Sequence, residues 1–571
     1  MSLPGPARRR VETWAPWAAG GLLACPVLVA YYPPMTDLPY HEAAIGILRR
    51  FDDVAMFPPG LYERNLGEPN QLFHLLAWGL SYLVSTRWAV KLAVAGVVLA
   101  IPVCAARFAR HAGASPLAAL VVAPMALGWL FSWGLVANLL GLAAFLAVMP
   151  ALDDLAREPH ARGALRCAGA ALLLYFAHEA VLFAFAGAAL GLALAHPISK
   201  RATLLRLVPF AASAVIAAAQ AWWQGRYTAP LFRDIPRVWD SPWHKLEEIP
   251  GMVVPAADGV VAAGMSGLCA LTIACFFWLR ARERRELASS QPAPAADAAR
   301  PGRARAWALR YRWELFVLAS IAAYFAFPLT LNGATMVYQR WFPPGFAVLA
   351  LAAAPRDLWA RPARVARVAL AILPVATLLV AGPSFADSDR EYRALDEIVG
   401  RVDQGSSVAS IDLGPRDPAR TFTTGTAGGR ILATRGGRLA FAFTSSSVSP
   451  VFMVARYQWN ESIARLGEDP WAFSIPDDFH RFRYLLLHTT DARLARTAVR
   501  GVRAEAAYIA TAGDWLLFES RLPTLPLLSE DVDASGVPQE TLADRIHAIL
   551  PGELAAGAAR WPSPGGRELT E

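Results

Sequence analysis

The first residues whose types could carry out chemistry lie in a short segment rich in proline, residues 33–42, Pro-Pro-Met-Thr-Asp-Leu-Pro-Tyr-His-Glu. A carboxylate such as Asp37 can act as a general base when it is held within hydrogen-bond reach of a hydroxyl group. The prolines hold the chain around Asp37 extended. His41 and Glu42 follow on a predicted amphipathic helix at the membrane interface. We therefore predict Asp37 and His41 as catalytic residues and Glu42 as a substrate-binding residue. The alternative is that Thr36 or Asp37 caps this helix.

Two adjacent ionisable residues, His178 and Glu179, interrupt the apolar stretch 172–194. Ionisable side chains within a membrane segment are costly, and they indicate a functional site by default. We predict that both residues bind substrate. The alternative is a polar turn at the membrane surface.

A third polar group is Tyr338, Gln339 and Arg340, which precede Trp341 in the segment 332–341. The planar guanidinium of arginine suits phosphate recognition, so we predict that these three residues also bind substrate. Interfacial anchoring by Arg340 and Trp341 is the alternative. Tryptophans and charged residues also cluster at 222–245, where stacking on a sugar and simple interfacial anchoring are both open.

The elements that must position these residues are apolar helices. Hydrophobic residues make up 55% of the chain and charged residues only 18%. The apolar residues form runs of about 15 to 21 without alternation, which favours membrane-spanning helices over barrel strands. About eleven spans are expected, near 14–31, 88–105, 116–132, 134–150, 165–178, 179–195, 203–223, 259–279, 313–331, 342–355 and 366–382.

The loops between these runs carry the excess arginine, which the positive-inside rule assigns to the cytoplasm. All basic loops share one side if the apolar segment 71–84 does not cross the membrane. An odd number of spans then places the N-terminus in the cytoplasm and residues 384–571 outside, with every candidate residue on that outer side, around a polar cavity. The alternative is a full crossing by 71–84 together with another span that is missed here. The net charge of +8 needs no nucleic-acid partner, because no recognition motif accompanies it.

The predicted fold is mainly α, a polytopic transmembrane helix bundle with a C-terminal α/β extracytoplasmic domain. We expect a transmembrane domain at 1–383 with a long first outer loop at 32–70, an α/β domain at 384–550 and a flexible tail at 551–571. Within the α/β domain we expect a helix at 389–402 and strands at 406–411, 439–444, 483–488 and 505–519, the last a hairpin that turns at Gly513-Asp514. The five cysteines lie in or beside apolar runs and predict neither disulfides nor a metal site.

The motif Thr36-Asp37-Leu38-Pro39-Tyr40-His41 resembles the Asp-x-Pro-x-His opening of uncharacterised bacterial members of the GT-C superfamily of polytopic glycosyltransferases. The order of first helix, long outer loop, helical body and outer C-terminal domain is also similar. The resemblance implies sugar transfer from a polyprenyl-phosphate-linked donor, with Asp37 as the base or as a metal ligand. Many members carry two adjacent acidic residues at this position, whereas Asp37 stands between Thr36 and Leu38. A divalent metal is therefore possible, and no cofactor is certain.

The sequence thus predicts an inverting membrane glycosyltransferase in a bacterial inner membrane. Its partners would be the lipid-linked sugar donor and membrane lipid, and its oligomeric state stays open. Arg340 would stabilise the departing lipid phosphate, where charge develops in the transition state. One alternative is a transporter or flippase for a lipid-linked sugar, although no inverted repeat is evident. A non-catalytic membrane scaffold that displays residues 384–571 is the other.

Overall fold

The computed structural model describes most of the chain, namely residues 5–196, 199–227, 237–255, 259–290, 303–331, 334–413, 424–446, 448–454, 473–475, 477–524 and 540–541. The chain divides into two compact units. We call the first the bundle unit, which consists of Met1–Val29, Pro69–Phe73 and Ala93–Pro383. The second, the C-terminal unit, consists of Ala30–Glu68, His74–Leu92 and Ser384–Glu571. The predicted domains at 1–383, 384–550 and 551–571 stay a prediction, and the tail lies outside the described residues.

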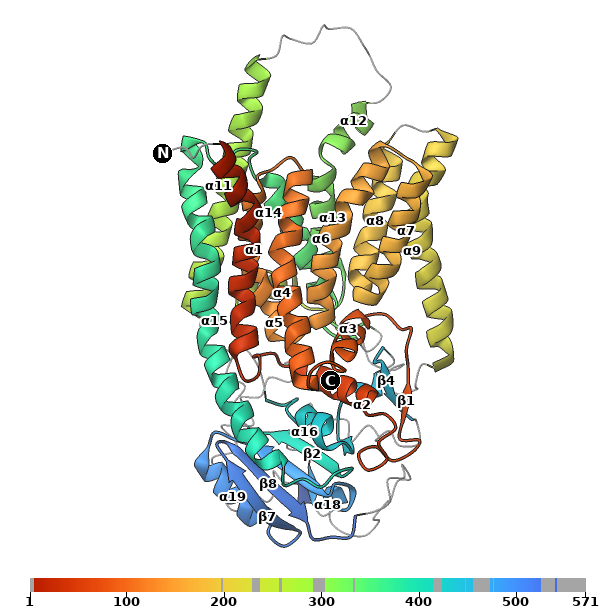
Figure 1. Cartoon of the computed structure of the whole chain (residues 1–571), viewed down its shortest axis with the longest axis vertical. Helices are drawn as coiled ribbons and strands as arrows, with labels where there is room; N and C mark the ends of the chain where they lie inside the picture. The colour runs from red at the N-terminus through yellow and green to blue at the C-terminus, as the bar shows by residue number, and fades with distance from the viewer. Residues whose placement is uncertain are drawn as a thin grey trace. The chain divides into compact units, whose positions relative to one another are not determined.

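The bundle unit is built from apolar helices whose buried sides share one large hydrophobic core. In Figure 1, α6, α7, α8 and α9 stand side by side, as their mutual packing requires. The α-helices that lie wholly or partly in this unit are α1 (Gly5–Val29), α3 (Leu72–Leu80), α4 (Thr86–His111), α5 (Trp129–Ser132), α6 (Val136–Arg157), α7 (Ala161–Ala177), α8 (Glu179–Ala195), α9 (Lys200–Tyr227), α10 (Pro242–Val253), α11 (Gly259–Ser290), α12 (Arg303–Arg310), α13 (Arg312–Ala326), α14 (Phe342–Ala353) and α15 (Arg364–Val399).

Five of the described helices are long and apolar enough to cross a membrane, namely α4, α6, α9, α11 and α15. The apolar window of α9 is only 17% buried, and that of α11 only 28% buried. Large apolar side chains such as Val215 and Leu271 therefore project outward, at 67% and 64% exposure. So much exposed apolar surface would be unfavourable in water, so these faces contact lipid, and the protein is a multi-pass membrane protein.

Two short segments refine the predicted spans. The predicted span 116–132 is not one continuous α-helix, because it consists of two 3₁₀ turns, Pro116–Val121 and Ala123–Leu127, followed by the four-residue α5. A proline opens the first turn, and another proline and a glycine follow, so a regular helix cannot continue. Helix α3 (Leu72–Leu80) has nine residues. At about 1.5 Å per residue it rises only about 14 Å, too little to cross about 30 Å of hydrocarbon.

Helix α15 differs from the prediction in its continuity. The sequence indicates two helices, a span at 366–382 and a second helix at 389–402. The structure has one helix, Arg364–Val399, with Pro374 and Pro383 inside it. Proline removes one backbone hydrogen bond, but the well-formed turns on either side can carry the helix through.

The C-terminal unit is centred on a five-stranded sheet of order β3-β2-β6-β8-β7. The first three strands are parallel, and β8 and β7 are antiparallel, joined by the predicted hairpin at Gly513-Asp514. This confirms an α/β arrangement. The strands of this sheet and the neighbouring elements of the unit are β1 (Tyr62–Arg64), β2 (Ser407–Asp412), α16 (Gly428–Arg435), β3 (Arg438–Leu439), β4 (Val451–Met453), β5 (Ser474–Ile475), α18 (Asp477–Arg481), β6 (Tyr484–His488), α19 (Ala492–Val502), β7 (Ala506–Ala512), β8 (Trp515–Ser520) and β9 (Glu540–Thr541).

The first loop belongs to this same unit and contributes the helix α2 (Leu38–Arg49). Figure 1 shows α2 beside α16, and a Cβ atom on Gly46 would lie only 3.0 Å from the carbonyl oxygen of Ala433. Strand β1 of the loop pairs antiparallel with β4. The prediction of an amphipathic helix at the membrane surface was wrong, because residues 38–48 are all buried. Even its polar residues His41 and Glu42 are enclosed, at 8% and 1% exposure, so α2 is packed inside protein.

Candidate functional site

Asp37 lies at the N-terminus of α2, in the backbone position of a helix cap. Its side chain makes no capping hydrogen bond, so the capping alternative is not supported. Every residue from 32 to 48 is buried except Asp37, which is partly exposed. Asp37 is therefore the one residue of segment 32–48 with partial exposure, and its buried neighbours hold its backbone in place.

His41 follows one turn later on α2, and its backbone N–H donates to the carbonyl of Asp37 at 3.2 Å. Its ring Nδ1 lies 2.9 Å from Nε2 of His74, and the ring of Phe443 packs against it edge-on at 5.0 Å. One imidazole of such a pair donates and the other accepts, so the two rings fix each other's orientation. His74 was missed at the sequence level because it stands alone in an apolar segment.

Glu42 is engaged inside the protein. It is 1% exposed, and its two carboxylate oxygens bind the Arg430 guanidinium and the Tyr32 hydroxyl. Arg430 also binds Asp396 at 2.8 Å. A buried ion pair is stable only when its remaining hydrogen-bonding groups are satisfied, as they are here. This geometry favours a structural role for Glu42, which fastens α2 to α16, over the predicted contact with substrate.

The close packing of α2 on α16 fixes the position of Asp37. A Cβ atom on Gly429 would overlap the carbonyl of Pro39, two residues after Asp37. The Thr426 hydroxyl donates to the carbonyl of Thr36, the residue before Asp37. Backbone contacts on both sides of the carboxylate therefore come from one short helix and the residues that precede it. Such support is what a positioned general base requires.

His178 and Glu179 lie in the bundle unit, where α7 ends and α8 begins. His178 is 2% exposed, and its Nδ1 accepts the backbone N–H of Ala180 at 3.1 Å, which caps α8. The backbone N–H of Glu179 donates to the side chain of Asn70 at 2.9 Å. The break between the two helices is therefore an ordered junction in which the Glu179 side chain is partly exposed.

Arg340 approaches the same junction, with Nη1 3.4 Å from Nε2 of His178. Because Nδ1 of His178 already accepts a hydrogen bond from Ala180, the ring proton belongs on Nε2. Two N–H donors then face one another, and neither can accept from the other. An anionic oxygen beside them would accept from both, so the Arg340 and His178 side chains together form a candidate phosphate contact.

Tyr338 and Gln339 precede Arg340 but are directed into the protein. The Tyr338 hydroxyl lies 2.6 Å from Glu248 and 2.9 Å from Asp240, and the Gln339 amide donates to Glu248 at 3.3 Å. Both side chains are buried. They hold α10 in place, which favours a supporting role for them over the predicted substrate contact. Asn332, Gly333, Arg233 and Asp234 lie outside the described residues.

A further ionisable cluster lies in the C-terminal unit, at the carboxyl ends of the parallel strands β2 and β6. Nδ1 of His488 is 2.8 Å from Asp412, and Nε2 is 3.2 Å from Glu391. Burial lowers the pKa of His488, but the bonds to Asp412 and Glu391 outweigh it and raise that pKa to about 9. His488 is therefore a buried imidazolium held between two carboxylates. Sequence patterns gave no signal for it, since its partners are far apart in the chain.

The sequence leaves open whether Asp37 is a metal ligand. Within the part of the chain that the structure describes, three candidate ligand atoms lie within 4.8 Å of one another at Glu391, His488 and Asp514. Asp37 belongs to no such group among the described residues. The use of Asp37 as a base or as a metal ligand therefore stays a prediction.

Comparison with known proteins shows a likeness in fold. No protein-family model matches the sequence, and no curated protein matches it. The crystal structure of ArnT from Cupriavidus metallidurans bound to undecaprenyl phosphate matches with a TM-score of 0.50 and 11% identity, over 89% of this chain and 98% of that one. AglB from Archaeoglobus fulgidus, in complex with an inhibitory peptide and a dolichol-phosphate, gives a TM-score of 0.38 and 12% identity, over 90% of this chain and 75% of that one.

The match extends over nearly the whole length of ArnT, and at 11% identity it shows a shared fold. The predicted fold, a GT-C-like transmembrane bundle with a C-terminal α/β domain, is therefore confirmed. The fold by itself does not assign a reaction, which has to be argued from the side chains.

Proposed function

We propose that this protein is a membrane glycosyltransferase that moves a sugar from a polyprenyl-phosphate-linked donor to an acceptor hydroxyl. The observation that carries the proposal is Asp37, an accessible carboxylate held by an otherwise buried segment in a chain with the GT-C fold. The ArnT structure of this fold holds undecaprenyl phosphate, which favours a lipid phosphate carrier here as well.

In the proposed step, Asp37 accepts the proton of the acceptor hydroxyl as the hydroxyl oxygen attacks the anomeric carbon of the donor sugar. The bond between that carbon and the phosphate oxygen breaks, and its electron pair leaves with the polyprenyl phosphate. Attack from the side opposite the leaving group inverts the anomeric centre. General base catalysis of this kind contributes about 10²- to 10⁴-fold to the rate.

The leaving phosphate gains negative charge during the step. Arg340 and the Nε2–H of His178 are the groups that we assign to that charge, because the two donors lie side by side and Arg340 is held there by its bond to the carbonyl of Thr335. Preorganised donors of this kind stabilise the transition state more than the ground state. Glu179, the first residue of α8, lies next to His178, and we assign it to substrate binding as well.

We further propose that the protein lies in a bacterial inner membrane, with its N-terminus in the cytoplasm and its C-terminal domain outside. The basic segments Arg8–Arg10, 157–166, 200–206 and 356–367 support this orientation by the positive-inside rule. Transfer would then occur on the extracytoplasmic side, and its acceptor would belong to the cell envelope.

The test uses the purified full-length protein, a labelled polyprenyl-phosphate sugar and cell-envelope lipid as acceptor. Asp37→Asn keeps the shape of the side chain but cannot accept the proton, so we expect kcat to fall at least about 10²-fold while donor binding is retained. Asp52→Asn is the matched control, since the Asp52 side chain is 91% exposed in the same loop. Equal transfer by Asp37→Asn and the wild type would refute the base assignment. Movement of intact donor across liposomes without transfer would favour a flippase.

A further inference from the structure

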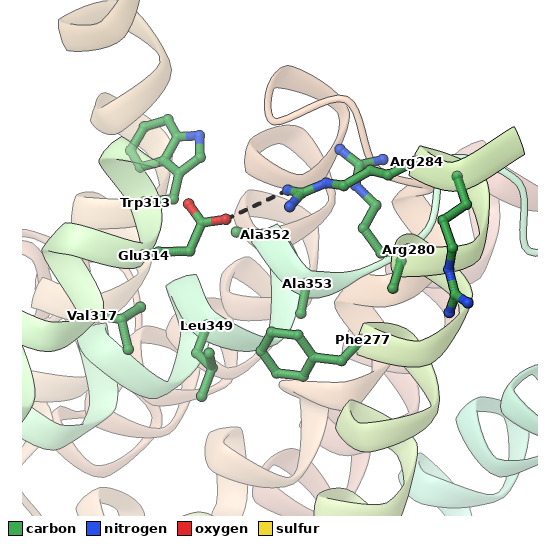
Figure 2. Close-up of a pocket in the computed structure, with 11 residues that line it drawn as sticks. Phe277, Arg280, Arg284, Trp313, Glu314, Val317, Leu349, Ala352 and Ala353 are labelled. Carbon is green, nitrogen blue, oxygen red and sulfur yellow. Dashed lines mark ion pairs between the residues drawn. The ribbon is translucent and has the colours of Figure 1, made fainter. Parts of the chain in front are cut away.

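A cavity of about 320 Å³ lies between α11, α13 and α14 of the bundle unit (Figure 2). Its polar part is formed by Arg280, Arg284 and Arg285 of α11 together with Glu314 of α13. Glu283 pairs with Arg280 beside the cavity, so three guanidinium groups face two carboxylates and the cavity keeps a net positive charge. Its size is within the range of about 300–1,000 Å³ that small-molecule sites occupy.

The other walls of the cavity are apolar. Figure 2 shows Phe277 below the arginines on α11, Val317 on α13, and Leu349 on α14. Outside the cavity the helix faces continue as lipid-facing surface, since Trp278 is 51% exposed and Leu318 is 61% exposed. A charged pocket therefore opens onto an apolar surface, a combination that fits a ligand with an anionic head and a hydrocarbon tail.

The position of the cavity along its helices matches the depth of lipid head groups. On α11 the apolar sequence ends at Leu279, and arginine follows at once. On α13 the order is reversed, because Arg312 precedes Trp313 and the apolar run comes after it. The change from apolar to charged residues marks the boundary between hydrocarbon and head groups, and tryptophan and arginine are enriched there.

The arginines differ in how far they are engaged by the protein. Arg284 makes an ion pair with Glu314 at 3.5 Å, drawn in Figure 2, and both side chains remain about two-fifths exposed. Arg280 pairs with Glu283 at 3.4 Å and is more enclosed, at 15% side-chain exposure. Exposed pairs of this kind are weak, so Arg284 can turn to a phosphate at little cost, while Arg280 holds the wall of the cavity.

We propose that this cavity is a specific site for an anionic phospholipid, with the phosphate at Arg284 and Arg285 and one acyl chain along α11 and α13. The site is separate from the Arg340 and His178 pair assigned to the donor phosphate, and it needs no assumption about the reaction. The lipid phosphate would replace the weak ion pair between Arg284 of α11 and Glu314 of α13, and would thereby stabilise this end of the bundle unit.

The test measures lipid binding to the full-length protein by native mass spectrometry, with phosphatidylglycerol and phosphatidylcholine offered in equal amounts. We expect a preference for phosphatidylglycerol in the wild type. Each basic residue near an anionic lipid contributes about 1 kcal/mol, so Arg284→Gln combined with Arg285→Gln should reduce the preference at least about tenfold. Ala352→Leu, which fills the cavity without a change of charge, should reduce binding of phosphatidylglycerol as well.

The matched control combines Arg282→Gln and Arg361→Gln, two exposed arginines outside the cavity. It removes the same charge from the same unit and should keep the preference. An equal loss in the control and in the cavity variant would mean a general positive surface and would overturn the proposal. So would the absence of any preference in the wild type. Binding of glycerol phosphate as tightly as the lipid would show a site for a free phosphate instead.

Discussion

Glu42 follows the candidate base Asp37 on α2, and its substitution distinguishes a structural role from a contact with substrate. Removal of one partner of a buried ion pair leaves the other uncompensated, so Glu42→Gln should reduce the free energy of unfolding by about 3 kcal/mol. Arg430 keeps its contact with Asp396, which holds the effect at the low end of such losses. The measurement is chemical denaturation of the purified protein, with transfer activity expressed per folded molecule.

If Glu42 has only this structural role, the variant that remains folded should transfer sugar at nearly the wild-type rate. A normal stability together with a raised KM for the donor or acceptor would instead restore the substrate contact that the sequence predicted. Asp53→Asn is the control, because Asp53 is an exposed carboxylate in the same loop whose side chain accepts a local backbone hydrogen bond from Ala55.

His488 makes stability depend on pH. Its pKa in the folded protein is about 9, above the value of about 6.5 expected when the chain is unfolded. A raised pKa stabilises the folded state fully below about pH 6.5, and that stabilisation, roughly 3 kcal/mol, is lost as the pH rises through 9. The melting temperature should therefore fall more between pH 6.5 and 9 in the wild type than in His488→Gln. An equal fall in melting temperature with pH in the two proteins would exclude this role. His480→Gln is the control and should behave as the wild type.

At the residue scale, the sequence predicted what local pattern can show. Asp37 was found because a lone carboxylate follows two prolines directly after an apolar helix. Its environment could not be found, because Arg430 binds Glu42 across 388 positions of the chain. Tyr338 and Gln339 were likewise predicted from their type, whereas Glu248 and Asp240, which engage Tyr338, lie about 90 positions earlier. Such pairs are fixed by tertiary packing alone.

The crossing of α2 and α16 is the contact at the element scale that positions the candidate base. Gly429→Ala would place a methyl group against the carbonyl of Pro39, and the backbone cannot give way without moving Asp37. Overpacking of this kind costs about 1–3 kcal/mol. We expect a loss of stability in that range, measured by denaturation, and a parallel fall in kcat, because the misplaced carboxylate lies outside hydrogen-bond reach of the hydroxyl.

Gly400→Ala is the matched control at the same scale. Gly400 lies in the same unit, and a Cβ atom there would meet nothing within 4 Å. Alanine at this position should leave both stability and kcat nearly unchanged. Wild-type behaviour of Gly429→Ala would show that α2 and α16 can separate without consequence, and the close packing would then not position Asp37.

Helix prediction succeeded where a run of apolar residues was long, as for α4, α6 and α9, because lipid imposes one requirement along the whole element. Helix prediction failed where the tendency of proline to interrupt a helix competes with tertiary packing. The prolines at 116 and 124 broke a predicted span into short turns, whereas Pro383 did not break α15. The pairing of β1 with β4 was also missed, since a three-residue strand carries almost no periodic signal.

Considered as a whole molecule, the chain should place its basic loops and its C-terminal domain on opposite sides of the membrane. The prediction is tested in a variant whose five cysteines are replaced by serine or alanine, since all five are free thiols. A new cysteine at Arg162, in the first turn of α7, reports one side, and a new cysteine at Arg503, after α19, reports the other. Both positions are exposed in their own units.

An impermeant maleimide applied to spheroplasts should label the Arg503→Cys protein and leave the Arg162→Cys protein unlabelled until the membrane is opened. The reason is electrostatic: arginine-rich short loops are retained in the cytoplasm, and an odd number of crossings then carries the last domain across. Labelling of both cysteines in intact spheroplasts, or of neither, would require an even number of crossings between positions 162 and 503. In that case α14, whose 12 residues rise only about 18 Å, becomes the element whose path must be reassigned.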